Sequence, residues 1–102
     1  MKVTHALVQV ASALMADPQA RHWGYDLSRR SGVRSGVLYP ILHRMLEEGW
    51  LRDGWEDRAE LNGRRPPRRY YLLTEEGISH LGAILRKAET DSRFRTLAER
   101  LA

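Results

Sequence analysis

The densest concentration of charge in the sequence is a group of arginines beside two adjacent prolines. Four arginines lie within six positions, and no acidic residue lies among them. The group consists of Arg64, Arg65, Arg68 and Arg69. Guanidinium groups bind phosphate oxygens through parallel hydrogen bonds, so arginines on a proline-stiffened segment favour contact with nucleic-acid phosphates. The alternative is a solvated loop and, for Arg69, an ion pair with Glu56 or Asp57.

A second group of residues suited to nucleic acid begins at Ser35 and Gly36. Tyr39 and His43 follow on the same side of a predicted helix, opposite its apolar side. Near the start of the helix, the residues on this side are small or aromatic and carry no charge, which suits contact with base edges. A half-buried Tyr39 and an idle, exposed His43 are the alternatives. The flanking cations, which could neutralise phosphates, are Arg29, Arg30 and Arg34.

Enzymatic and metal chemistry have little support in the sequence. There is no cysteine, which excludes disulfides, zinc thiolate sites and thiol catalysis. The histidines lack ligand spacing, and neither a phosphate-binding glycine loop nor a hydrolase motif occurs. We therefore expect no enzymatic activity, no metal and no cofactor.

Length and composition indicate one small domain. The chain has 102 residues, 42% apolar residues and a net charge of +4, which is typical of a folded domain. Lysine contributes only two of the 17 basic residues. A GC-rich genome explains this excess of arginine over lysine as well as a nucleic-acid-binding function does. With neither a membrane span nor a signal-peptide pattern, a cytoplasmic protein is expected.

Helical periodicity predicts three helices before residue 50. Thr4 can cap the first, which ends at residues 17–18, and the second spans about residues 24–31 before Gly32. The third begins at Ser35 as N-cap and stops at Gly49. Its expected apolar side consists of Val37, Leu38, Ile41, Leu42, Met45 and Leu46.

Two predicted strands and a C-terminal helical region complete the chain. Strands over residues 50–57 and 68–74 flank a polar loop and form a hairpin. Thr74 then caps a helical region, residues 75–102, which forms either one helix or two. We expect its apolar stripes to contact a second copy of the chain, with packing inside one chain as the alternative. The stripes consist of Ile78, Leu81, Leu85, Ala88, Phe94, Leu97 and Leu101.

The order of these elements predicts the fold. Three helices, a two-stranded wing and a C-terminal helix make a mainly α protein with a small β-hairpin, a winged helix-turn-helix. Residues 1–74 form the predicted DNA-binding domain and residues 75–102 the dimerisation region. Trp23, Trp50 and Trp55 are expected in the core, with Trp55 in a dimer cleft as the alternative.

Three segments resemble the PadR family of transcriptional regulators: GYDLSRRSGVRSG, LYPILHRMLEEGWL and GRRPPRRYYLLTEEG. The resemblance covers about residues 24–77. It implies a homodimeric repressor that binds an inverted-repeat operator in double-stranded DNA through Ser35, Gly36 and Tyr39. The wing contacts implied are Arg64, Arg65 and Arg68, and the last helix supplies the dimer contact.

The resemblance also bears on ligands and partners. The short C-terminal region matches the subclass with a single dimerisation helix region, and a small-molecule effector is left open. No tryptophan follows Trp55, which argues against the drug site of some short members. The functional alternative is a protein-interaction adaptor, which requires the third helix and the wing to face opposite sides of the molecule.

Overall fold

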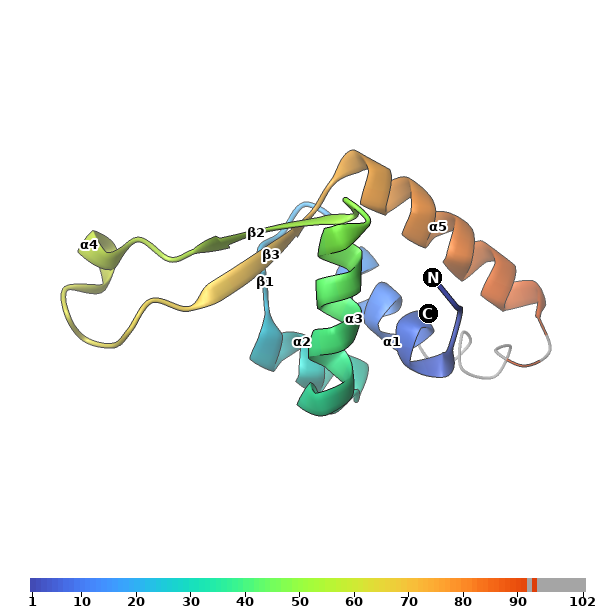
Figure 1. The fold of residues 1–102 in the computed structure, drawn as a ribbon, viewed down its shortest axis with the longest axis horizontal. Coiled ribbons are helices and arrows are strands. Elements are labelled where there is room, and N and C mark those ends of the chain that lie inside the picture. Colours follow the sequence, from blue (N-terminus) through green and yellow to red (C-terminus); the bar gives the residue numbers. More distant parts are fainter. Residues whose placement is uncertain (92, 94–102) are drawn as a thin grey trace.

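The computed structural model describes residues 1–91 and residue 93. Three helices, α1 (His5–Met15), α2 (Gly24–Ser31) and α3 (Ser35–Glu47), form a compact body from which a long hairpin projects (Figure 1). A further helix, α5 (Glu75–Thr90), follows the hairpin. The predicted winged helix-turn-helix order is therefore confirmed.

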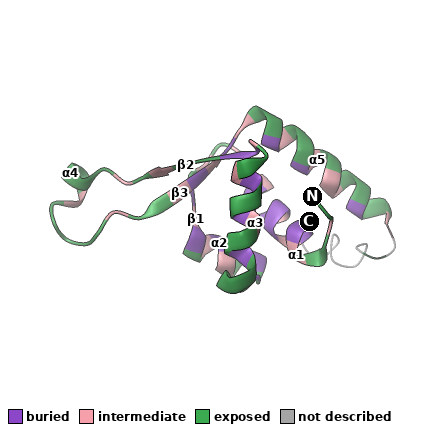
Figure 2. Cartoon of the chain, viewed as in Figure 1, coloured by how far each residue is buried: buried purple, intermediate pink, exposed green. Residues whose placement is uncertain are grey.

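Helix α1 lies at the centre of the body and packs against α2, α3 and α5. The Thr4 hydroxyl caps it, accepting a hydrogen bond of 3.1 Å from the Leu7 backbone N–H. Burial extends around most of the helix (Figure 2) and includes Val8 and Ala13, which a one-sided apolar stripe does not predict. Because three other helices pack around it, α1 keeps only a narrow, partly accessible side, which includes Gln9 and Ser12.

The turn from α2 to α3 is short and held by serine hydroxyls. Gly32 ends α2 at φ +73°, a left-handed conformation that favours glycine. The Ser28 hydroxyl donates to the Val33 carbonyl at 2.8 Å, and the Val33 N–H donates to the Ser31 hydroxyl at 3.1 Å. Arg34 rather than Ser35 is the N-cap of α3, one residue before the predicted position.

The hairpin belongs to a three-stranded antiparallel sheet, not the two-stranded one predicted. Its order is β1 (His22–Trp23), β3 (Arg69–Leu73), β2 (Leu51–Trp55). Both residues of β1, which lie between the predicted first and second helices, take part: His22 pairs with Tyr71 and Trp23 with Tyr70. Such a short run carries no alternation from which a strand can be predicted. We call residues 51–73 the wing.

The tip of the wing contains a single helical turn that was predicted as loop, α4 (Arg58–Leu61). The Asp57 carboxylate accepts from the Ala59 N–H at 2.9 Å, which caps this turn. Asn62 and Gly63 both adopt left-handed backbone, as their pairing in the sequence predicts. Pro66 and Pro67 precede β3 and lie outside its ladder.

Helix α5 uses its apolar stripe inside one chain. Leu81 is fully buried and Ala88 is 2% exposed, and both belong to clusters that include α1 residues. Packing inside one chain, the alternative, therefore accounts for the burial of these two residues, because α1 covers them. Ile78 and Leu85 are partly buried against the same clusters. Phe94, Leu97 and Leu101 lie outside the described residues, as does the question of a second helix.

Within the described residues, no helix combines the length and apolar character needed to cross a membrane.

The start of α5 lies directly against the start of β2. The Thr74 hydroxyl caps α5 and donates to the Gly49 carbonyl at 2.7 Å, while the Thr74 N–H donates to the Trp50 carbonyl at 3.1 Å. A Cβ at Gly77 would overlap the Trp50 carbonyl oxygen. The two backbones touch here, so no side chain fits.

Gly77→Ala is expected to lower the free energy of unfolding by about 1–3 kcal/mol, because neither backbone can move away cheaply. Urea denaturation measures the change. Gly82→Ala is the matched control in the same helix, where the nearest atom, 3.3 Å away, is the flexible end of Arg86. Equal stability of the two variants would contradict the argument.

Candidate nucleic-acid interface

The outward side of α3 is open, as predicted. Ser35, Gly36 and His43 are exposed, and Tyr39 is 46% exposed. Leu38, Leu42 and Met45 are fully buried on the opposite side. Val37, predicted on the buried side, is 48% exposed because it lies at the boundary between the two. The Nε2 atom of His43 lies 3.7 Å from the Glu47 carboxylate, and both side chains are solvated.

One cleft joins α3 to the base of the wing. It has a volume of about 370 Å³ and is lined by Tyr39 of α3, residues at the start of α2, and Trp55, Arg68 and Arg69 of the wing. The outward side of α3 and the wing thus share one surface. The adaptor alternative required them to face opposite sides.

Two aromatic residues that line this cleft have strongly exposed side chains. Tyr25 is 72% exposed and Trp55 is 64% exposed. Trp55 was expected in the core, but it is the last residue of β2 and lines the cleft, whereas Trp50 is buried. Exposed aromatic rings of this size commonly mark interaction sites.

The wing arginines are not free of acids in space. Glu56 lies on the opposite arm of the hairpin and accepts two hydrogen bonds from the Arg65 guanidinium, at 2.5 and 2.8 Å. The same carboxylate accepts from the Arg68 backbone N–H at 2.9 Å and from its Nε at 3.3 Å. Arg69 pairs with Asp53 at 2.8 Å, so the alternative of an ion pair with Glu56 or Asp57 gives the wrong acid.

These contacts fix the charge of Glu56. The Arg65 guanidinium lowers the pKa of Glu56 to about 2, with further help from the Arg68 N–H. The same hydrogen bond raises the pKa of Arg65. Both groups therefore remain ionised near neutral pH, and Glu56 offsets part of the positive charge of the wing.

Arg64 keeps its full charge at the tip. Among the described residues, its side chain has neither a hydrogen bond nor an ion pair, and it is exposed. It lines a shallow hollow with Arg58, Gly63 and the two prolines. Of the three predicted wing contacts, Arg64 is the one most available to a phosphate.

Aromatic rings also hold arginines beside this surface, Arg68 among them. The Arg68 guanidinium lies 4.9 Å from the Trp23 ring centre, and Arg21 lies 4.2 Å from the Tyr70 ring. Arg29 lies 5.8 Å from the ring of Tyr25. Sequence reasoning missed Arg21 and Tyr25, because the short strand that orders this edge was not predicted.

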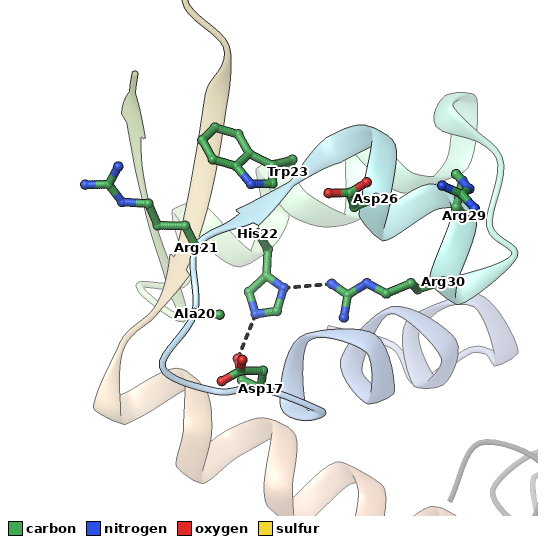
Figure 3. A pocket seen from close by; sticks show the side chains of 8 residues that line it. All are labelled: Asp17, Ala20, Arg21, His22, Trp23, Asp26, Arg29 and Arg30. Carbon is green, nitrogen blue, oxygen red and sulfur yellow. Dashed lines mark hydrogen bonds between the residues drawn. The ribbon is translucent and has the colours of Figure 1, made fainter. Parts of the chain in front are cut away.

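The cations around α2 differ in their availability. Arg29, Arg30 and Arg34 are all exposed, but Arg30 also has a structural task that the sequence did not reveal. Its guanidinium donates to the Ala13 carbonyl at 3.2 Å and to His22 Nδ1 at 2.8 Å (Figure 3). Arg30 therefore ties α2 to α1 and β1.

His22 is held in one protonation state by this arrangement. It is 2% exposed, and its Nε2 lies 2.9 Å from the Asp17 carbonyl (Figure 3). Because Arg30 can only donate, Nδ1 must accept, and Nε2 carries the proton. Burial lowers the pKa of His22, and the charge of Arg30 lowers it further.

Protonation of His22 is expected to favour unfolding. Its pKa is lower in the folded chain, so the unfolded state binds the proton more tightly, and stability falls as the pH drops below about 6.5. The loss is at most about 1.4 kcal/mol per pH unit. Urea unfolding at several pH values measures it. His22→Gln should show a shallower dependence, and an equally steep one would contradict the assignment.

The Glu56 carboxyl is expected to titrate near pH 2 in the folded protein. Carboxyl NMR measures this, and Arg65→Gln should move the midpoint up towards the ordinary value of 4.5. Any stability that Glu56 provides is complete above pH 4.5 and is lost as the pH falls through about 2. Arg64→Gln is the control, since Arg64 does not contact Glu56. If the Glu56 midpoint stays near pH 2 in Arg65→Gln, Arg65 is not the cause of the low pKa.

The chain is similar to known proteins both in sequence and in fold. Residues 19–83 match the transcriptional regulator PadR-like family, while no curated protein matches the chain significantly. The chain is similar in structure to smu.1704 from Streptococcus mutans, with 22% identity and a TM-score of 0.67 over 88% of this chain and 85% of that one. It is also similar to a PadR family transcription regulator from hypervirulent Clostridium difficile, with 17% identity and a TM-score of 0.69 over 97% of this chain and 100% of that one.

These structural likenesses support the winged-helix fold, and the family match covers most of the surface described above. The chain therefore belongs to the PadR-like family, whose members are DNA-binding transcriptional regulators and not enzymes.

Proposed function

We propose that this regulator is a homodimeric repressor that binds an inverted-repeat operator with α3 and the wing. The observation that carries the proposal is the shared cleft, which brings Tyr39 of α3 beside Arg68 and Arg69 of the wing. A duplex lying along this surface could meet both elements at once. The proposed place of action is the cytoplasm, because the partner is chromosomal DNA.

The proposed docking places α3 in the major groove. A helix fits a groove about 12 Å wide, and the exposed side of α3 offers Ser35, Gly36 and Tyr39 to base edges and phosphates. His43 lies one turn further along and faces the same way. Arg29, Arg30 and Arg34 are exposed beside the helix and are proposed to neutralise phosphates, with Arg30 the weaker contact because its guanidinium already bonds to Ala13 and His22.

The wing is proposed to follow the backbone towards an adjacent minor groove, where narrow, negative grooves attract guanidinium groups. Arg64 is the leading contact, since no acid in the part of the chain that the structure describes pairs with it. Arg65 and Arg68 are proposed as weaker contacts, because Glu56 already engages both.

Dimerisation would place two copies of α3 on one duplex. Two half-sites one helical turn apart require the reading helices to lie about 34 Å from each other. The proposed contact residues are Phe94, Leu97 and Leu101, together with Ile78 and Leu85 of α5, which are partly buried. Light scattering should give twice the chain mass of 11.8 kDa; a monomer at working concentrations would reject this part of the proposal.

DNA recognition can be tested with a duplex that the purified protein enriches from a random-sequence pool and with a scrambled control. Fluorescence anisotropy over a range of salt should show tighter, salt-dependent binding to the enriched duplex. Arg64→Gln should weaken binding to both duplexes and reduce the salt slope by about 1, whereas Tyr39→Ala should reduce the preference between them.

Lys87→Gln is the matched control, since it removes one charge from the last turn of α5, away from the wing (Figure 1). It should leave both affinities and the salt slope unchanged. Equal affinity of the wild-type protein for enriched and scrambled DNA would reject sequence-specific recognition.

A further inference from the structure

The first residue of α2 is a glycine whose own backbone conformation does not require one. Among the described glycines, a left-handed backbone occurs at Gly32, Gly49 and Gly63 but not at Gly24. A neighbour excludes a side chain instead. A Cβ at Gly24 would overlap the Tyr39 Oη and would lie 2.9 Å from its Cζ and 3.1 Å from its Cε1. The Tyr39 ring therefore lies directly over the backbone of α2.

This close approach decides where the Tyr39 side chain lies. Gly24 is buried and Tyr39 is 46% exposed, and both line the cleft between α3 and the wing. Tyr71 lines the same cleft; burial raises its pKa, and the nearby Tyr39 adds to the increase. The ring of Tyr39 thus rests where α2, α3 and the base of the wing meet.

We propose that Gly24 is a positioning residue for DNA recognition: by lacking a side chain, it lets the Tyr39 ring lie against α2 and fixes the orientation that Tyr39 presents to DNA. The inference rests on the proposed function, because it takes Tyr39 as a DNA contact. Gly24 itself is buried and is not proposed to touch the DNA. A side chain held in one orientation loses less conformational freedom on binding than one that must be ordered by the DNA.

Gly24→Ala tests this directly because the added methyl group meets the end of a rotatable side chain. Tyr39 can swing away by changing its χ1 rotamer, while the α2 backbone stays packed. This differs from Gly77, where the obstacle is backbone. The alanine variant should keep the fold and the thermal midpoint of the wild type but lose the native orientation of Tyr39.

The functional measurement is a double-mutant cycle on the enriched and scrambled duplexes. Gly24→Ala and Tyr39→Ala should each reduce the ratio of the two affinities by about tenfold, the size of one lost base contact. The double variant should be no worse than Tyr39→Ala alone, because Gly24 acts only through the ring. Gly82→Ala, the same change in α5, should leave the ratio unchanged.

A structural measurement needs no DNA. In the free wild-type protein, NMR should show a nuclear Overhauser effect between the Tyr39 ring protons and the Gly24 Hα protons. It should be lost in Gly24→Ala. Adding Tyr39→Phe to Gly24→Ala removes the most crowded atom, and the phenyl ring should regain contact with α2 and recover part of the affinity ratio. If Gly24→Ala lowers the stability of the protein, the comparison of this variant with and without Tyr39→Phe still tests the inference.

The outcomes separate the inference from the proposed function. If Tyr39→Ala lowers the affinity ratio and Gly24→Ala does not, Gly24 is not a positioning residue, although Tyr39 still reads DNA. The inference also fails if Gly24→Ala has the same effect with and without Tyr39. If Tyr39→Ala binds like the wild type, the proposed role of Tyr39 falls, and the role of Gly24 falls with it.

Discussion

The direction of the wing depends on a backbone contact between the end of α3 and the start of α5. Gly49 turns the chain out of α3 in a left-handed conformation, and the next residue, Trp50, lies against Gly77 with no side chain between them. Thr74 joins both sides, donating to the Gly49 and Trp50 carbonyls. Backbone atoms in contact allow little adjustment, so α3 and the wing keep a fixed angle. The cleft that holds Tyr39 beside Arg68 and Arg69 is a consequence of that angle.

The features that depend on neighbouring residues could be predicted from the sequence. Thr4 and Thr74 cap helices as their position before apolar periodicity indicates, and Gly32 stops α2. The segment around Asn62 turns as its residue types require. The open side of α3 follows from helical spacing alone, since Leu38, Leu42 and Met45 leave Tyr39 on the far side. These local rules were sufficient to predict the fold.

The features that depend on distant contacts could not be predicted. Strand β1 exists because Trp23 pairs with Tyr70, far along the chain. Leu81 and Ala88 form an apolar stripe whether the covering surface is α1 or a second chain, and only the three-dimensional packing decides between them. In the sequence, the arginines of the wing form a cluster without acids, but the pairing of the two strands brings Glu56 among them. Trp55 is likewise exposed because it is the last residue of β2 in its ladder with β3, a position that its residue type does not reveal.

The wing and the adjoining edge of the sheet hold arginines in two ways, with different electrical results. A carboxylate, such as Glu56 against Arg65, immobilises a guanidinium and cancels its charge at a distance. An aromatic ring immobilises it through its quadrupole and leaves the monopole intact, as Tyr70 does for Arg21. The long-range field around this protein is therefore set less by how many arginines it contains than by which kind of neighbour orders each one.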